Sequence, residues 1–367
     1  MIEWLFAFFI FFYCLFIIYL WIGWERVAIF ANREYAPSVA VIIPVRNEAK
    51  NIENLLNNIL NQSYRGELQL ILVDDHSEDD TVALARKVFN KQANCKLLEL
   101  IDKEGKKAAI TEGVTNAEAE IILTTDGDCS VSSKWVEAMV ESFDESTQFV
   151  SGPINFIKES TIFNYMQSIE FTSLIASGAA FIGWGKPVMA NGANLAFRKA
   201  AFMDVNGFEG NETTASGDDV FLLHKIVALH PNSIAFAMHQ EAIVQTKAQP
   251  TISLFIKQRI RWASKWKAYT DIFTKSTAVL VFLVSLLLVI WPFLVITHLV
   301  TVFTWINLLI IKSFFDYFFL KHVSNQLRVK INVLAFVLLQ VIYPLYVVFT
   351  ALFSFKNSYQ WKGRQVK

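Results

Sequence analysis

The sequence predicts an α/β domain that is flanked by membrane-spanning helices. Three observations support this fold class. The 367-residue chain is 54% hydrophobic and only 18% charged, which is too apolar for a water-soluble protein of this length. Its long uncharged runs lie at the two ends, and its middle alternates short apolar runs with segments of helical periodicity. We therefore expect one α/β domain between apolar helices.

Residues 1–25 are expected to form a transmembrane helix. The run from Trp4 to Trp24 carries no charge, and about 20 such residues cross a hydrocarbon core as a helix. A cleavable signal peptide would have a basic first part and a cleavage site of small residues, whereas this chain begins Met1-Ile2-Glu3. We expect a retained anchor.

Residues 36–250 are expected to form the α/β domain. Strand-length apolar runs occupy 38–43, 68–73, 96–100 and 120–123, and helical spacing occupies 52–61, 81–90, 106–117 and 135–143. This alternation predicts βαβ units and a mostly parallel sheet, with ligands bound beyond the carboxyl ends of the strands. The absence of GxGxxG and GxxxxGK[ST] motifs argues against a dinucleotide-binding fold and a P-loop enzyme.

The C-terminal part is expected to return to the membrane. Residues 251–276 read as an amphipathic interfacial helix, 277–356 as two or three spans, and 357–367 as a basic tail. We expect a helical pair with a turn near 297–298, followed by a segment that either crosses or is broken at Pro344 into a re-entrant element.

Two charged residues interrupt the second helix of the predicted pair. Lys312 and Asp316 are four residues apart on one helical face, so we expect them to neutralise each other in the low-dielectric layer. A proton relay is the alternative.

Basic residues beside the spans predict the orientation. Arg26 and Arg33 follow the first span, and six basic residues precede the second: Lys257, Arg259, Arg261, Lys265, Lys267 and Lys275. By the positive-inside rule the α/β domain is cytoplasmic, and we expect an integral protein of the cell (inner) membrane.

Charge and cysteine content exclude other classes of partner. Lys and Arg total 33 and Asp and Glu total 33, so nothing supports a nucleic-acid partner. Cys14, Cys95 and Cys129 have no zinc-ligand or redox spacing and read as buried small side chains.

Acidic residues follow two of the predicted strands. Asp126 and Asp128 come after the fourth strand, and two carboxylates at this spacing can hold Mg²⁺ or Mn²⁺ bridging a diphosphate. Asp75 follows the second strand and could accept hydrogen bonds from a nucleoside, whereas residues 77–80 serve the next helix. A solvated turn and a helix cap are the respective alternatives.

A third acidic pair and a basic aromatic motif complete the set. Asp218 and Asp219 precede a helix, where a carboxylate could take a proton from an attacking hydroxyl, with capping as the alternative. In the Gln258-x-x-Arg261-Trp262 motif, arginine can grip a phosphate and tryptophan can stack on a sugar. Interfacial anchoring would explain the same residues.

In this order the motifs resemble those of the membrane-bound family 2 glycosyltransferases. The resemblance covers about 38–262 and includes an opening with Pro44, Arg46 and Glu48, a Gly-Lys stretch with Lys106, and an acceptor-side loop from Asn191 to Arg198.

The resemblance implies a GT-A nucleotide-diphospho-sugar transferase domain, which is a Rossmann-like mixed sheet, and a UDP-sugar donor with inversion at the anomeric carbon. Such a displacement needs a base on the acceptor hydroxyl, and our candidate is Asp219, with Asp218 as the fallback because spacing alone cannot separate neighbours. Asp128 is expected to hold the metal, with Asp126 touching the metal or the ribose. The implied donor-binding residues are Pro44, Arg46, Glu48, Asp75, Lys106, Asp126 and Arg261, and the implied acceptor-side residues are Asn194, Gln258 and Trp262.

The acceptor follows from the small number of helices. One span before the domain and two or three after it are too few to enclose a hydrated polymer, so we expect a lipid or lipid-linked acceptor in contact with membrane lipid. A processive polysaccharide synthase working as an oligomer or with partner subunits, making a glycan, is the alternative. A catalytically silent membrane scaffold is an alternative of another class.

Overall fold

The computed structural model describes residues 2–29, 34–90, 92–157, 161–211, 217–264, 272–354, 359–361 and 364–366. The chain divides into two compact units. The helical unit comprises Met1–Glu25, Lys158–Ala180 and Ala248–Tyr359, and the sheet unit comprises Arg26–Ile157, Phe181–Lys247 and Gln360–Lys367. Lys158–Ala180 thus groups with the apolar helices, although the sequence-based boundary of 36–250 included it in the α/β domain.

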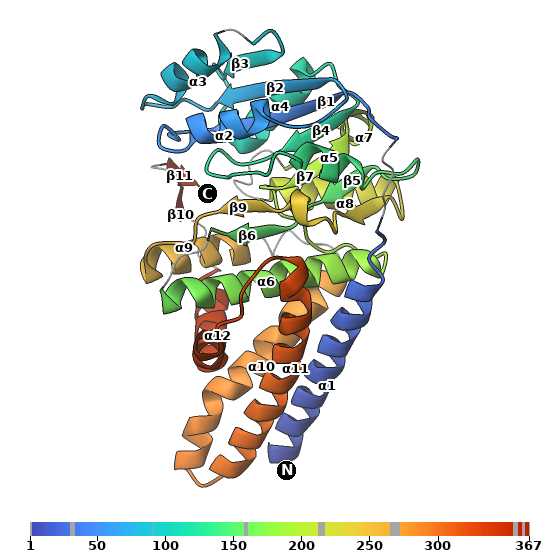
Figure 1. Cartoon of the computed structure of the whole chain (residues 1–367). Helices are drawn as coiled ribbons and strands as arrows, with labels where there is room; N and C mark the ends of the chain where they lie inside the picture. The colour runs from blue at the N-terminus through green and yellow to red at the C-terminus, as the bar shows by residue number, and fades with distance from the viewer. Residues whose placement is uncertain are drawn as a thin grey trace. The chain divides into compact units, whose positions relative to one another are not determined.

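The sheet unit begins with the predicted βαβ alternation (Figure 1). Its first elements are β1 (Val39–Val45), α2 (Ile52–Leu60), β2 (Leu68–Asp74), α3 (Thr81–Phe89), β3 (Cys95–Glu99), α4 (Lys106–Asn116) and β4 (Ile121–Thr124). They are followed by α5 (Trp135–Val140), β5 (Phe149–Ser151), β7 (Leu195–Arg198), α7 (Lys199–Asp204), α8 (Asp218–Leu229) and β8 (Ile234–Phe236). The four predicted strands are all present.

The main sheet has seven strands in the order β3-β2-β1-β4-β7-β5-β8. β1 pairs in parallel with β2 and β4, whereas β7 runs antiparallel to both of its neighbours, β4 and β5. The sheet is therefore mixed, and the predicted loop of 191–198 ends in a strand. Two small sheets pair β6 (Ile154–Phe156) with β9 (Val244–Thr246), beside the 3-10 helix η1 (Gln240–Ala242), and β10 (Tyr359–Trp361) with β11 (Arg364–Val366).

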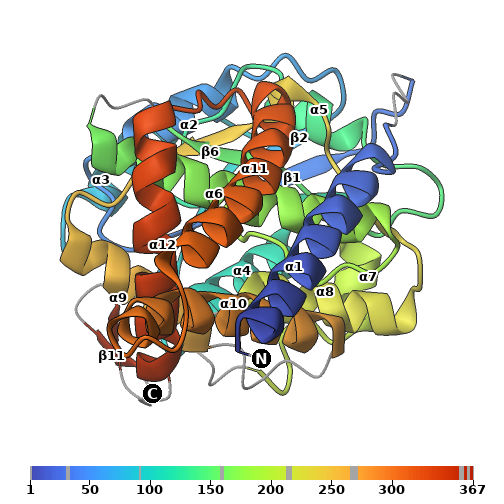
Figure 2. The same cartoon turned by 90° about the horizontal axis from the view of Figure 1, so that it is seen from below.

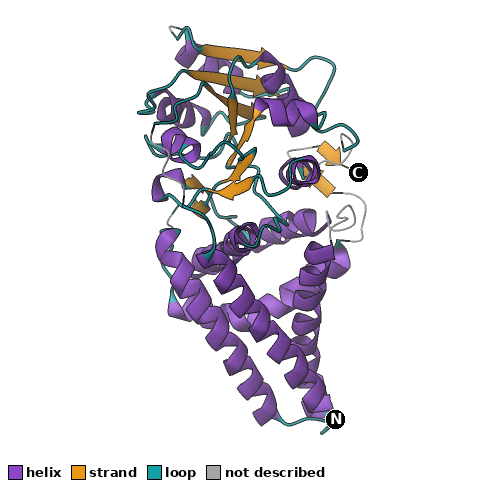
Figure 3. Cartoon of the chain, turned by 90° about the vertical axis from the view of Figure 1, so that its right-hand side faces the viewer, coloured by secondary structure: helices purple, strands orange, loops and turns teal. Residues whose placement is uncertain are grey.

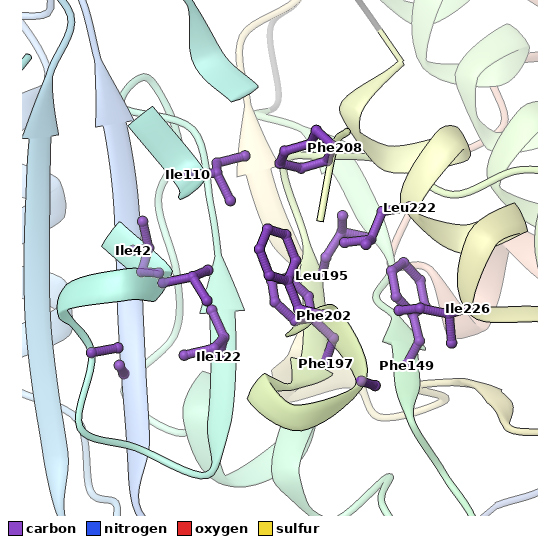
Figure 4. Close-up of a cluster of buried hydrophobic side chains, with 14 of the residues drawn as sticks. Ile42, Ile110, Ile122, Phe149, Leu195, Phe197, Phe202, Phe208, Leu222 and Ile226 are labelled. Carbon is purple, nitrogen blue, oxygen red and sulfur yellow. The ribbon is translucent and has the colours of Figure 1, made fainter. Parts of the chain in front are cut away.

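A hydrophobic core fixes the elements that carry the acidic motifs. Ile42 of β1 and Ile122 of β4 pack in the same cluster as Phe197 of β7, and Leu222 and Ile226 of α8 belong to it as well (Figure 4). The central strands β1 and β4 are apolar almost throughout, as is typical of parallel strands covered on both faces. The ends of β4 and α8 therefore lie on rigid elements.

Four helices of the helical unit are long and apolar enough to cross a membrane: α1 (Ile2–Glu25), α10 (Ile272–Ile296), α11 (Val302–Gln326) and α12 (Val333–Phe353). Figure 3 shows the long helices in purple and the strands of the sheet unit in orange. In Figure 1, α1 is seen along its length whereas α12 is foreshortened, and Figure 2 shows α12 extended. The axes of α1 and α12 are therefore not parallel. α12 also continues through Pro344 without a break.

The two charged residues of α11 form an ion pair, as predicted. Lys312 Nζ lies 2.6 Å from Asp316 Oδ2 and donates to Gln340 Oε1 at 2.9 Å. The Tyr13 hydroxyl donates to Asp316 Oδ1 at 2.8 Å. This network joins α1, α11 and α12. Both charged side chains are buried, so an unpaired charge at this site would be costly, and the hydrogen bonds satisfy them.

Several helices differ from the sequence-based expectation. α6 (Ile162–Gly183) was not predicted, and α9 (Ile252–Ala263) ends before residues 265–271, which lie outside the described part of the chain. Arg33, Lys265 and Lys267, used above for orientation, are also outside it.

Candidate active site

Four segments of the sheet unit bring polar groups together beyond the end of β4. Lys106 opens α4, Asp126 follows β4, Gly192 precedes β7, and Asp218 opens α8. Lys106 Nζ lies 2.7 Å from Asp126 Oδ1 and 3.0 Å from Asp218 Oδ2, and it donates to the Gly192 carbonyl at 3.3 Å. Residues separated widely in the sequence thus form one charged cluster.

Asp219 joins this cluster through the backbone. Its Oδ2 accepts the Gly192 N–H at 3.1 Å, and its Oδ1 accepts the Val220 N–H at 2.8 Å. A β-carbon added to Gly192 would lie 2.7 Å from Asp218 Oδ2 and 2.8 Å from Lys106 Nζ. A side chain at position 192 would therefore displace the Asp218 carboxylate and the Lys106 ammonium, a close approach that the sequence analysis did not identify.

The Lys106 ammonium is the cation of the cluster. Burial opposes its charge, but the neighbouring Asp126 and Asp218 carboxylates outweigh burial and raise the pKa of Lys106 above its ordinary value. Its side chain is 22% exposed. Lys106 therefore stays protonated at neutral pH and balances the two carboxylates.

Asp126 and Asp128 offer hard oxygen ligands and are both partly exposed. Among the described residues, no group of three or more His, Cys, Asp or Glu side chains is arranged to hold a metal ion. The pair nevertheless fits Mg²⁺ or Mn²⁺, because such ions commonly complete their coordination with substrate phosphates and water. Burial, with the Asp126 and Asp128 charges, raises the pKa of the neighbouring Cys129 thiol well above its ordinary value.

The first two strands place the predicted nucleotide-binding residues next to each other. Arg46 Nη1 donates to the carbonyls of Asp75 and His76, at 2.8 and 2.9 Å. Arg46 is buried and therefore shapes the loop that carries Asp75. Asp75 is also buried, and its Oδ1 lies 3.1 Å from His76 Nδ1.

Two further predicted residues lie on or after β1. Pro44 is within the strand, and Glu48 is buried just beyond it, where its Oε2 accepts from Asn51 at 2.8 Å. A β-carbon on Gly127 would lie 2.9 Å from Glu48 Cγ. The segment after β1 therefore packs directly against the Asp126-Gly127-Asp128 turn.

The assignment of Asn194 to the acceptor needs correction. Its side chain is fully buried, and both amide hydrogens are used, in bonds to the carbonyls of Pro153 and Ala242 at 2.7 and 2.8 Å. Its Oδ1 accepts from Trp135 Nε1 at 3.0 Å. Asn194 therefore fixes the start of β7 and has no donor left to offer an acceptor.

Gln258, Arg261 and Trp262 belong to α9 in the helical unit and are each partly exposed. Thr251 caps this helix by accepting the Leu254 N–H at 3.3 Å. The Trp262 ring lies 5.9 Å from that of Phe171 in α6. The three motif residues thus share one short helix.

The comparison with known families decides the class of this chain. A family model described as glycosyl transferase family 2 matches residues 40–205, a stretch that runs from β1 to α7 and includes Lys106, Asp126 and Asp128. The chain carries a family 2 glycosyltransferase domain. The predicted family and enzyme class are confirmed.

Individual relatives agree with this assignment. Glycosyltransferase AglE of Haloferax volcanii is 27% identical over 208 residues, which are 53% of this chain and 67% of that protein. A poly-beta-1,6-N-acetyl-D-glucosamine synthase of Staphylococcus epidermidis is 24% identical over 238 residues, which are 64% of this chain and 55% of that protein. The chain therefore matches about two thirds of one relative's length and about half of the other's.

The family 2 glycosyltransferase domain also resembles a solved structure. The mannosyltransferase PcManGT from Pyrobaculum calidifontis, in complex with GDP-Man and Mn²⁺, has a TM-score of 0.57 and 18% identity. The likeness covers 96% of this chain and 98% of that one. The predicted GT-A fold with apolar helices at both ends is confirmed.

Proposed function

We propose that this glycosyltransferase moves a sugar, with inversion, from a UDP-sugar to a hydroxyl of a lipid or lipid-linked acceptor. The observation that carries the proposal is the cluster in which Lys106 bridges Asp126 and Asp218. In this cluster the turn after β4, with Asp126, lies next to the acidic first turn of α8, which supports a metal and a base acting side by side. A phosphate-binding function and a proton-accepting function thereby share one site.

Asp219 is the proposed base. The Asp218 carboxylate is engaged with the Lys106 ammonium, whereas the oxygens of Asp219 accept neutral backbone donors that hold the carboxylate in a fixed direction. Asp219 would take the proton of the acceptor hydroxyl as its oxygen bonds to the anomeric carbon and the bond to the diphosphate breaks. This single displacement inverts the configuration.

The departing diphosphate needs positive charge. A bound Mg²⁺ or Mn²⁺ held by Asp128 and Asp126 would supply it. Lys106 already lies beside Asp126, and Arg261 is the proposed second contact, since its guanidinium can grip a phosphate with two hydrogen bonds. PcManGT was solved with GDP-Man and Mn²⁺, which supports a metal and a sugar nucleotide but leaves the base open.

The acceptor is proposed to be lipid because the chain holds four apolar helices of membrane-spanning length in the described residues. The second candidate is a polysaccharide synthase, favoured by the similarity to the poly-beta-1,6-N-acetyl-D-glucosamine synthase and by the Gln-x-x-Arg-Trp motif. The small number of membrane-spanning helices argues against the polysaccharide synthase, because so few helices cannot enclose a polymer unless several copies of the chain assemble.

Sealed membrane vesicles of both orientations test the proposal. Vesicles containing the protein are given labelled UDP- and GDP-sugars with Mn²⁺, and products are separated into organic-soluble and high-mass fractions. We expect organic-soluble label, and only in inverted vesicles, because the domain is proposed to face the cytoplasm. A polymer ladder would favour the synthase, label from right-side-out vesicles would refute the orientation, and no transfer with any donor would indicate a scaffold.

A further inference from the structure

A buried ion pair joins α6 to α9 in the helical unit. Arg259 Nε donates to Glu170 Oε1 at 3.0 Å, and Arg259 Nη2 donates to Glu170 Oε2. The two side chains are only 5% and 3% exposed. Tyr346 of α12 adds a third hydrogen bond, from its hydroxyl to Glu170 Oε1 at 2.8 Å. One carboxylate on α6 thus receives donors from two other helices.

A second anchor lies one turn earlier on α6. Gln167 Nε2 donates to the Gln249 carbonyl, and Gln167 Oε1 accepts the Gln249 N–H, both at 2.9 Å. This reciprocal pair fixes the segment that leads into α9. The entry to the helix and the helix itself are therefore both held by buried side chains of α6.

The ion pair is in direct contact with the Gln-x-x-Arg-Trp motif. The Arg259 guanidinium carbon lies 4.2 Å from the centroid of the Trp262 ring, and Arg259 Nη1 donates to Gln258 Oε1 at 2.6 Å. Phe171, which follows Glu170 on α6, forms a ring pair with Trp262. A change in the direction of Arg259 would therefore alter its contacts with Gln258 and Trp262.

We infer that Glu170 and Arg259 are positioning residues, which set the direction of Gln258, Arg261 and Trp262 on α9. The inference rests on the proposed role of these three residues in donor and acceptor binding. Without the Glu170 charge, Arg259 is left buried without a counter-ion and must move or draw in water. A displacement of about 1 Å in a substrate-holding group can lower turnover by about 100-fold.

Matched variants separate positioning from simple loss of stability. Glu170→Gln removes the charge from the α6–α9 pair. Asp316→Asn removes the charge from the Lys312–Asp316 pair, whose hydrogen bonds within the described part of the chain go to α1 and α12 and not to α9. We expect both to lower the melting temperature in detergent. Only Glu170→Gln should lower kcat/KM of the folded enzyme, by roughly 10- to 100-fold. Equal kinetic losses in the two variants, or none in Glu170→Gln, would overturn the inference.

Milder variants serve if the charge removals prevent folding. Tyr346→Phe and Tyr13→Phe each remove one hydroxyl that donates to the buried carboxylate of an ion pair. We expect a kinetic loss in Tyr346→Phe and none in Tyr13→Phe.

An apolar replacement of the pair gives a rescue test. Buried ion pairs replaced by apolar side chains of similar volume are often as stable as the original. Glu170→Met combined with Arg259→Met should therefore recover the melting temperature, while turnover stays low because the contacts of Arg259 with Gln258 and Trp262 are gone. Recovery of turnover as well would mean that the pair acts only through folding.

A spectroscopic readout keeps this inference separate from the proposed function. A fluorine label on Trp262, assigned with Trp262→Phe, should shift in Glu170→Gln and not in Asp316→Asn. If the wild-type protein transfers no sugar, the proposed function fails, but this signal still decides the positioning role. An unchanged signal in Glu170→Gln would overturn it.

Discussion

Replacement of Asp219 by asparagine is expected to lower turnover by about 100-fold or more, which is the lower end of the effect of losing a general base. Asparagine keeps the size of the side chain, and its single amide oxygen can accept the Gly192 N–H while giving up the bond from Val220 N–H, so the loop before β7 should remain in place. It cannot take a proton from the acceptor hydroxyl. Turnover is measured with saturating donor, and nucleotide affinity, measured by calorimetry, should change little.

Asp218→Asn is the matched comparison, because the two residues are neighbours on the first turn of α8. It removes the ion pair with Lys106 and should therefore weaken donor binding more than Asp219→Asn does. If Asp218→Asn alone abolished turnover, the base would be the neighbouring residue. If neither variant lowered turnover, the base would lie outside this pair.

Removal of divalent metal is expected to abolish transfer, and Asp128→Asn is expected to do so at ordinary metal concentrations. An amide oxygen is a weaker ligand for Mg²⁺ or Mn²⁺ than a carboxylate, and the departing diphosphate would lack its counter-charge. Activity is measured in EDTA and after Mg²⁺ or Mn²⁺ is restored.

Asp80→Asn is the control for this metal prediction, since Asp80 is exposed and its side chain makes no capping hydrogen bond at α3. It should behave as the wild type in every condition. Full activity of the wild type in EDTA would contradict the metal assignment.

The sequence was informative where local pattern and sheet geometry act together. Apolar runs of strand length predicted β1, β2, β3 and β4. β1 and β4 are buried parallel strands without polar alternation, whereas β3 lies at the sheet edge, carries Lys96 and Glu99, and is only partly buried. Polar residues directly after such runs had to collect at one edge of the sheet. Asp75 after β2 and Asp126 after β4 follow that geometry, whereas Asp218 opens α8 and meets Lys106 only through the fold.

The sequence was uninformative where distant partners decide a residue's state. Gln167 and Glu170 interrupt the apolar pattern of α6, so the helix resembled neither a membrane span nor a simple amphipathic helix. Their partners, Gln249 and Arg259, lie 82 and 89 residues away along the chain. The role of Asn194 could not be predicted for the same reason, since only the fold brings the carbonyls of Pro153 and Ala242 to its side-chain amide.

The configuration of the new glycosidic bond tests the central claim most directly. The purified enzyme is given Mn²⁺, an acceptor lipid and a donor whose sugar is α-linked to the diphosphate, and the anomeric proton of the product is observed by NMR. A single displacement with Asp219 as the base predicts a β-linked product. An α-linked product would contradict this mechanism and the role assigned to the acidic turn of α8.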